Sequence, residues 1–236
     1  MRDAVRIAWR EVRWEIFGDR GSIVRMGFFA VLPVIFVLSQ PGGRGSDFNN
    51  ASLFVLALQC AFFPALSGVA LIASTFTQEK ENGTIIPLLA SPVRDLDIVV
   101  GKLIGMIIPT LAVCAATLAL YYVLATLRYG GARVSAVLPP QVLYGLVMVA
   151  LLYLLTAGSW ALILAALVKT SRAGQQLAGL LIAISVALLA GLAVAAANIA
   201  NGWALLALAV ILLLSDVFAL DVARRVWRRE EVLARI

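Results

Sequence analysis

The polar residues that could take part in chemistry are few, and most of them lie in one segment, from Thr77 to Lys102. The chain has no histidine, which removes the commonest metal ligand and general base. Its two cysteines, Cys60 and Cys114, lie inside apolar runs, so the sequence supports neither a disulfide framework nor a thiolate metal site. Most classes of soluble enzyme are therefore disfavoured, and we expect neither a metal nor a cofactor in this chain.

Gly101 and Lys102 do not belong to a phosphate-binding loop. The G-x-x-x-x-G-K-[ST] pattern requires a glycine where Leu96 stands and a serine or threonine where Leu103 stands. The chain therefore lacks the loop that cradles nucleotide phosphates, and it cannot hydrolyse ATP by that route. If ATP drives its action, the hydrolysis must take place on a partner chain.

The segment from Thr77 to Lys102 contains two helix starts. Thr84 can cap a short helix over Ile85–Ala90, with Pro87 at a position where its missing N–H has no intrahelical partner to lose. Ser91 can cap the next helix, with Pro92 at the first helical position, where proline is favoured. The pattern predicts a short helix on the membrane surface and then a helix that continues into the following apolar run.

The short helix has an apolar face that needs cover. The residues of that face are Ile85, Ile86, Leu88 and Leu89. One interpretation is that the face packs against this protein's own helices, and the other is that it inserts into a groove on a partner protein. The pattern alone leaves both interpretations open.

Apolar helices must hold this segment in place. Hydrophobic residues make up 62% of the 236 residues and charged residues only 14%, against about 45–50% and 25% in soluble domains. Six apolar runs approach or exceed the roughly 17–25 residues that cross hydrocarbon, and lipid forces such segments to be helical. The runs cover residues 23–40, 51–76, 103–127, 141–168, 174–198 and 203–221. The sequence predicts an all-α integral membrane protein with six transmembrane helices.

The basic residues predict how these helices are oriented. With six spans both termini lie on one side, and that side carries 16 of the 19 lysines and arginines. By the positive-inside rule it is the cytoplasmic side. The net charge of +6 is therefore a sign of topology, and we expect membrane lipid rather than nucleic acid as a partner.

Residues 1–22 predict an amphipathic helix that lies in the membrane interface. At 100° per residue one apolar stripe forms, with arginines on an adjacent face. The stripe consists of Val5, Ala8, Trp9, Val12 and Ile16. Ile7, Trp14 and Phe17 lie off it, so we expect this helix to contact protein as well. This helix is either a simple membrane anchor or a lever that moves when a cytoplasmic partner moves.

At the other end of the sequence, residues 222–236 are expected to form a basic cytoplasmic tail.

Small residues recur at every fourth position of the fifth run. They are Gly179, Ala183, Ala187, Gly191 and Ala195. Such a row permits close helix packing, either within the chain or at a dimer seam or translocation path.

A few polar residues stand inside the apolar runs. Gln59, Tyr153 and Asn198 could line a path or bond to neighbouring backbone. Asp216 is the one acid in the interior of a run, since Asp221 is the last residue of the sixth run, and we expect Asp216 to reach the interface or to pair with Arg224 or Arg225.

The stretch Glu79-Lys80-Glu81-Asn82-Gly83-Thr84, followed by Leu88-Leu89-Ala90-Ser91-Pro92 and Gly101-Lys102, resembles the signature loop of ABC-2-type transporter permeases. In that family an E-x-E-x-G-T segment and a coupling helix join the second and third spans. The resemblance implies a dimer of six-helix protomers, identical or related, in a prokaryotic cytoplasmic (inner) membrane. It also implies a P-loop ATP-binding subunit that holds ATP and Mg²⁺ and docks on the coupling helix. The residues implied in coupling are Glu79, Glu81, Gly83, Thr84, Ile85, Ile86, Leu88, Leu89, Ser91 and Pro92.

Two departures from the family pattern place the chain near its short members, which include the haem-exporter-like B subunits. Ile86 stands where the family often has glutamate, and Asn198–Gly202 leaves no room for the outer re-entrant helices of many members. We expect a non-catalytic permease subunit of an ABC exporter. The alternatives are a stand-alone secondary transporter or channel, an intramembrane enzyme and a scaffold. The first of these usually shows charged relays or broken helices, and the second shows a catalytic set of side chains. Of these features the sequence shows only a single intramembrane acid, Asp216.

Overall fold

The computed structural model describes residues 2–13, 20–39, 50–82, 95–167 and 203–226, with scattered helical positions between Ala173 and Ala187. All the regular structure of these residues is helical, as expected for an all-α membrane protein. The helices are α1 (Arg2–Glu11), α2 (Arg20–Ser39), α3 (Asn50–Glu81), α5 (Asp95–Tyr129), α6 (Gly131–Val137), α7 (Pro140–Leu167) and α9 (Trp203–Val226).

Three helices in this part of the chain are long and apolar enough to cross a membrane. Their spanning parts are Asn50–Ala73, Val100–Tyr129 and Pro140–Leu164, and α9 contributes a shorter apolar stretch, Ala209–Ala219. The three overlap the second, third and fourth runs expected from the sequence. The fifth run, 174–198, lies largely outside the described residues, so the count of six spans stays a prediction.

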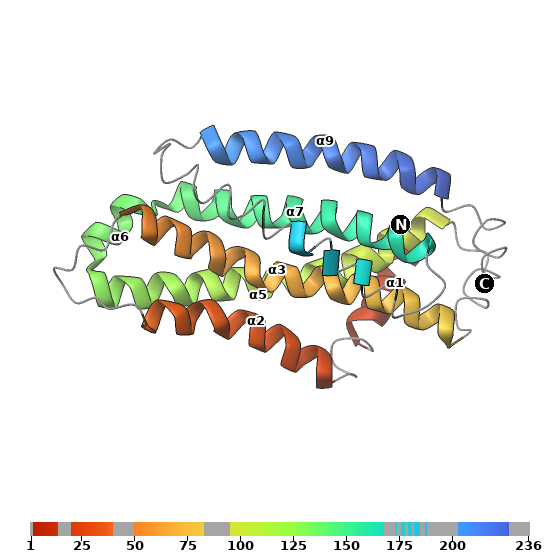
Figure 1. Cartoon of the computed structure of the whole chain (residues 1–236), viewed down its shortest axis with the longest axis horizontal. Coiled ribbons are helices and arrows are strands. Elements are labelled where there is room, and N and C mark those ends of the chain that lie inside the picture. The colour runs from red at the N-terminus through yellow and green to blue at the C-terminus, as the bar shows by residue number, and fades with distance from the viewer. Residues whose placement is uncertain are drawn as a thin grey trace.

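The long helices lie side by side along one axis (Figure 1). The chain alternates in direction through α2, α3, α5 and α7, whereas α7 and α9 run in the same direction. A further membrane-spanning segment between α7 and α9, as expected from the sequence, would require this shared direction. One end of the bundle holds α1, the last turn of α3, the first turn of α5 and the last turn of α9. The opposite end holds α6. The arginine-bearing α1 and the Arg224–Arg225 pair therefore lie at the same end, in agreement with the charge distribution.

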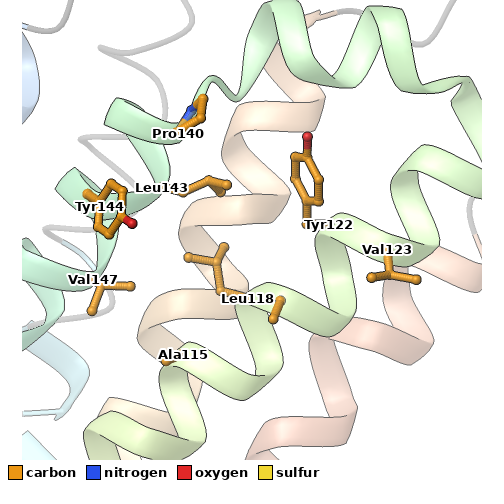
Figure 2. Close-up of a pocket in the computed structure, with 9 residues that line it drawn as sticks. Ala115, Leu118, Tyr122, Val123, Pro140, Leu143, Tyr144 and Val147 are labelled. Carbon is orange, nitrogen blue, oxygen red and sulfur yellow. The ribbon is translucent and has the colours of Figure 1, made fainter.

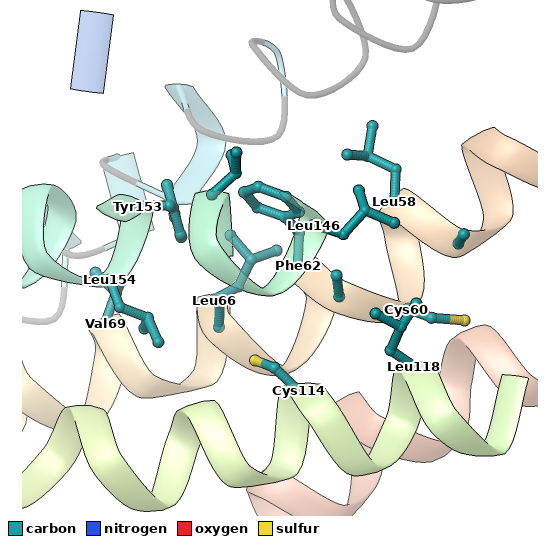
Figure 3. Close-up of a cluster of buried hydrophobic side chains, with 14 of the residues drawn as sticks. Leu58, Cys60, Phe62, Leu66, Val69, Cys114, Leu118, Leu146, Tyr153 and Leu154 are labelled. Atoms are coloured by element: carbon teal, nitrogen blue, oxygen red, sulfur yellow. The ribbon is translucent and has the colours of Figure 1, made fainter. Parts of the chain in front are cut away.

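The packed core is built around α3, which contacts α2, α5 and α7. Small α3 residues such as Ala57, Ala61 and Ala65 are almost fully buried, and they let the neighbouring backbones approach. Larger side chains from the three helices fill the remaining space (Figure 3). They include Leu58, Phe62 and Leu66 of α3, Leu118 of α5, and Leu146 and Leu154 of α7. Cys60 and Cys114 are free thiols in this core.

Two contacts fix α5 against α3. A Cβ atom added at Gly68 would lie 2.5 Å from Cγ2 of Thr110, so only glycine fits the crossing point as it stands. Thr110 cannot easily turn away, because its hydroxyl donates to the carbonyl of Met106 at 2.7 Å. Nearer the α6 end, the buried hydroxyl of Tyr121 donates to the carbonyl of Leu53 at 2.7 Å. The two helices are therefore held together at two separated levels.

We predict that Gly68→Val lowers the stability of the protein by about 1–3 kcal/mol, the usual cost of overpacking a tight contact. Gly27→Val is the matched control, because a Cβ at Gly27 meets nothing within 4 Å. Thermal unfolding in detergent, followed by the loss of the monodisperse chromatographic peak, measures both variants. Equal unfolding midpoints for the two would show that the crossing tolerates a larger side chain.

Candidate functional site

The residues expected to couple to an ATPase lie at the bundle end where α3 ends and α5 begins (Figure 1). The helix α3 does not stop with its apolar span but continues to Glu81, about 12 Å past Ala73 at 1.5 Å per residue. Glu79 and Glu81 therefore lie on a helical extension, which is followed by an exposed turn at Asn82. The remaining coupling residues, Gly83, Thr84, Ile85, Ile86, Leu88, Leu89, Ser91 and Pro92, fall outside the described residues, and their role stays a prediction.

The N-terminal helix α1 packs against α5 close to this end. Ile7 is buried, which confirms that the helix contacts protein through a residue off its expected lipid stripe. Ala8 was expected in that stripe, and this expectation is wrong, because Ala8 is buried too. Ile7 and Ala8 point about 100° apart on the helix, so the protein contact covers an arc that includes both. Trp9 remains 69% exposed, and Arg6 and Arg10 are exposed beside it.

The small-residue row is uncovered where the structure describes it. Gly179, Ala183 and Ala187 are helical and exposed, and a Cβ at Gly179 would meet nothing within 4 Å. Packing within this chain therefore leaves these three positions free for another surface. Gly191, Ala195 and Asn198 lie outside the described residues.

Two other candidates for a path lie on neighbouring core helices. Tyr153 of α7 is 7% exposed, and its ring packs on Phe62 of α3 with 5.5 Å between the centroids. Figure 3 shows both rings among the aliphatic side chains of the core. Gln59 of α3 is half-buried. In this conformation Tyr153 contributes its ring to the α3–α7 contact.

A polar seam between α7 and α9 was not recognised from the sequence. The indole N–H of Trp160 donates to the hydroxyl of Ser215 at 3.3 Å, and the Trp160 and Phe218 rings lie 6.0 Å apart. One turn away on α7, Thr156 donates to the carbonyl of Leu152 at 2.9 Å and approaches that of Leu212 at 3.4 Å. The signal for this seam is the four-residue spacing of Thr156 and Trp160, which puts both on one face of an otherwise apolar helix.

Asp216 belongs to this seam. Its carboxyl group lies near the hydroxyl of Thr156, and its Oδ1 atom is buried with no hydrogen-bond partner among the described residues. The expectation that Asp216 reaches the interface or pairs with Arg224 or Arg225 stays a prediction, since the side chains of both arginines fall outside the described part of the chain.

We predict that Asp216→Asn raises the thermal unfolding midpoint of the protein. The amide is neutral and therefore costs less to bury than a carboxylate with one buried oxygen that has no hydrogen-bond partner, and an unsatisfied buried group costs about 1–3 kcal/mol, more when it is charged. Asp221→Asn is the control, because Asp221 is exposed on the same helix. A lower midpoint for Asp216→Asn than for Asp221→Asn would show that the charge of Asp216 has a stabilising partner.

A model of the family described as ABC-2 family transporter protein matches residues 29–215 of the chain. The match begins within α2, contains α3, α5, α6 and α7 whole, and ends at Ser215 in the polar seam. It also contains the segment between α3 and α5 that carries the expected coupling residues. No curated protein sequence matches the chain at a significant level.

Proposed function

Because this chain belongs to the ABC-2 family of transporter proteins, we propose that it is the permease subunit of an ABC exporter, driven by a separate P-loop ATP-binding subunit. The family match over residues 29–215 carries this proposal. Membership makes the chain an integral membrane component of an ABC transporter. The direction of transport and the identity of the partner are the parts that we add.

The distribution of charge supports a cytoplasmic ATPase at the coupling end. This end holds the arginines of α1 and of α9, together with the acidic extension of α3 (Figure 1). A nucleotide-binding partner meets ATP in the cytoplasm, the side that the positive-inside rule assigns to this end. We place ATP and Mg²⁺ on that partner, and we place the protein in a prokaryotic inner membrane.

The packing of the helices offers a route by which motion at the coupling segment would cross the membrane. The segment 83–94 is joined directly to α3 and α5, two helices of 32 and 35 residues. The Gly68–Thr110 contact and the Tyr121–Leu53 hydrogen bond hold these helices together, so a push on either one moves the pair. α1 rests on α5 and would move with it, which supports the lever interpretation of that helix.

We further propose that two copies of the chain, or two related chains, form the transporter through the small-residue row. Gly179, Ala183 and Ala187 are exposed in this chain, and small residues are the ones that let helix backbones meet in lipid. The translocation path would then run along the seam between the two permeases.

We predict that the tagged chain, expressed together with the ATP-binding subunit encoded beside it, purifies as a complex with two copies of each. Leu88→Glu or Leu89→Glu should lower the recovery of the ATPase about tenfold or more, because a charge placed in an apolar docking groove costs more than 1.4 kcal/mol. The measurements are the mass of the complex and the ratio of the two subunits.

Ser135→Glu serves as the control, since Ser135 is exposed on α6 at the opposite end of the bundle. All three glutamate variants should keep a monodisperse permease. A chain that purifies alone in all cases would refute the proposed partner, and unchanged ATPase recovery with Leu88→Glu and Leu89→Glu would refute the docking role of the segment.

A further inference from the structure

A groove of about 380 Å³ lies between α5 and α7 in the half of the bundle nearest α6 (Figure 2). From α5 it is lined by residues that include Leu118, Ala119 and Tyr122, and from α7 by Leu143, Tyr144 and Val147. Leu118 is buried at its floor, whereas Ala119 and Tyr144 are exposed at its rim. The hollow is therefore open to one side of the helix pair.

The lining suits an alkyl chain. None of the side chains that line the groove is charged, and its side-chain polar atoms are the hydroxyls of Tyr122 and Tyr144. Figure 2 shows these two rings on opposite helices, with Leu143 between them. An apolar hollow of this kind excludes ionic ligands, because it offers no group to replace the water that such ligands lose.

The groove continues the lipid-facing surface of the bundle. Both of its helices contain membrane-spanning parts, and the face of α5 that adjoins it exposes Leu120, Val123 and Leu127. Along α5 the groove begins at Val123, about 9 Å from the helix end at Tyr129, and reaches Ala115, about 21 Å from that end. This depth is close to one leaflet, about half of a 30 Å hydrocarbon core.

A single hydrocarbon chain suits the hollow better than a whole second protein helix does. A helix with its side chains is about 10 Å across, so only side chains of such a helix would enter a groove of about 380 Å³. A single hydrocarbon chain is much thinner, and it lies along the helix axes when it extends from the headgroup level toward the bilayer centre. The volume and direction of the groove therefore favour lipid over a second copy.

We propose that this groove binds one acyl chain of a phospholipid from the outer leaflet. The acyl chain fills the groove between α5 and α7 and makes the van der Waals contacts that the lining side chains lack when the groove is empty. The rings of Tyr122 and Tyr144 flank the part of the acyl chain nearest α6. Aromatic side chains with a polar tip are favoured there, near the membrane interface. The assignment to the outer leaflet rests on the proposed orientation, whereas the binding of an acyl chain rests on the groove itself.

The test uses the purified protein, with its ATPase when present, in nanodiscs of phosphatidylglycerol that carries a photoactivatable diazirine on one acyl chain. Light-induced labelling, mapped by mass spectrometry, should concentrate on peptides that contain Ala115–Val123 and Leu143–Val147. Ala119→Trp fills the groove and should reduce that labelling about fivefold, which corresponds to a loss of roughly 1 kcal/mol of binding.

Ala116→Trp is the matched control, because Ala116 is exposed on the same helix but does not line the groove. It should leave the labelling unchanged. Val147→Phe blocks the groove from α7 and should reduce the labelling in the same way. It replaces Ala119→Trp in the test if that variant does not give a monodisperse protein.

Two outcomes would overturn the proposal. Labelling of the groove peptides no stronger than that of the exposed side chains Ile104 and Ile108 would show ordinary annular lipid only. Equal labelling in the groove-filling and control variants would show that no chain enters the hollow. Neither outcome bears on whether an ATPase co-purifies, so the groove and the proposed function fail independently.

Discussion

The structure depends on one constraint: inside hydrocarbon there is no water to bond to the peptide groups, so the chain must satisfy them itself. It does so with long helices, and even the polar side chains within them bond to backbone carbonyls of the preceding turn. Thr110, Thr117 and Thr156 all donate to the carbonyl four residues earlier. The same constraint leaves little polar surface for catalysis. The charged residues gather at the ends of the helices, where a partner can reach them.

Since lipid is as apolar as the side chains, burial alone does not hold these helices together. Close contacts do so instead, and they are concentrated on α3. The side chain of Thr110 of α5 packs directly on Gly68. Gly158 of α7 lies so close to Ile72 that a Cβ added at Gly158 would be 2.9 Å from Cδ1 of Ile72. By contrast, α9 meets α7 through a polar seam in which Trp160 bonds to Ser215 and Thr156 approaches the carbonyl of Leu212. The bundle thus has two kinds of contact. The central helices α3 and α5 pack tightly and are joined by the coupling segment, whereas the outer helix α9 makes a more polar contact with α7.

Much of this organisation could be predicted from the sequence. Runs of apolar residues predict helices in lipid without any knowledge of tertiary structure, and one acidic loop sufficed to identify the family. The end of α3 was harder, because Thr75, Thr77 and Gln78 resemble a loop, yet the helix continues through them to Glu81. The burial of Ala8 and of the Asp216 Oδ1 atom, and the groove between α5 and α7, depend on which helix faces meet. Helices that are apolar all round carry no stripe from which to read those faces.

The orientation of the bundle is decisive for the proposed function, because a partner that uses cytoplasmic ATP must reach the end where α3 and α5 meet the coupling segment. Single cysteines at Asn82 and at Ser135, in a chain whose two buried cysteines are replaced, mark the two ends. Labelling with a membrane-impermeant maleimide measures which end is accessible in intact cells, with any outer membrane made permeable to the reagent. We predict that Ser135→Cys is labelled in intact cells and that Asn82→Cys is labelled only after the inner membrane is permeabilised. Labelling of Asn82→Cys in intact cells, with Ser135→Cys protected, would contradict the account.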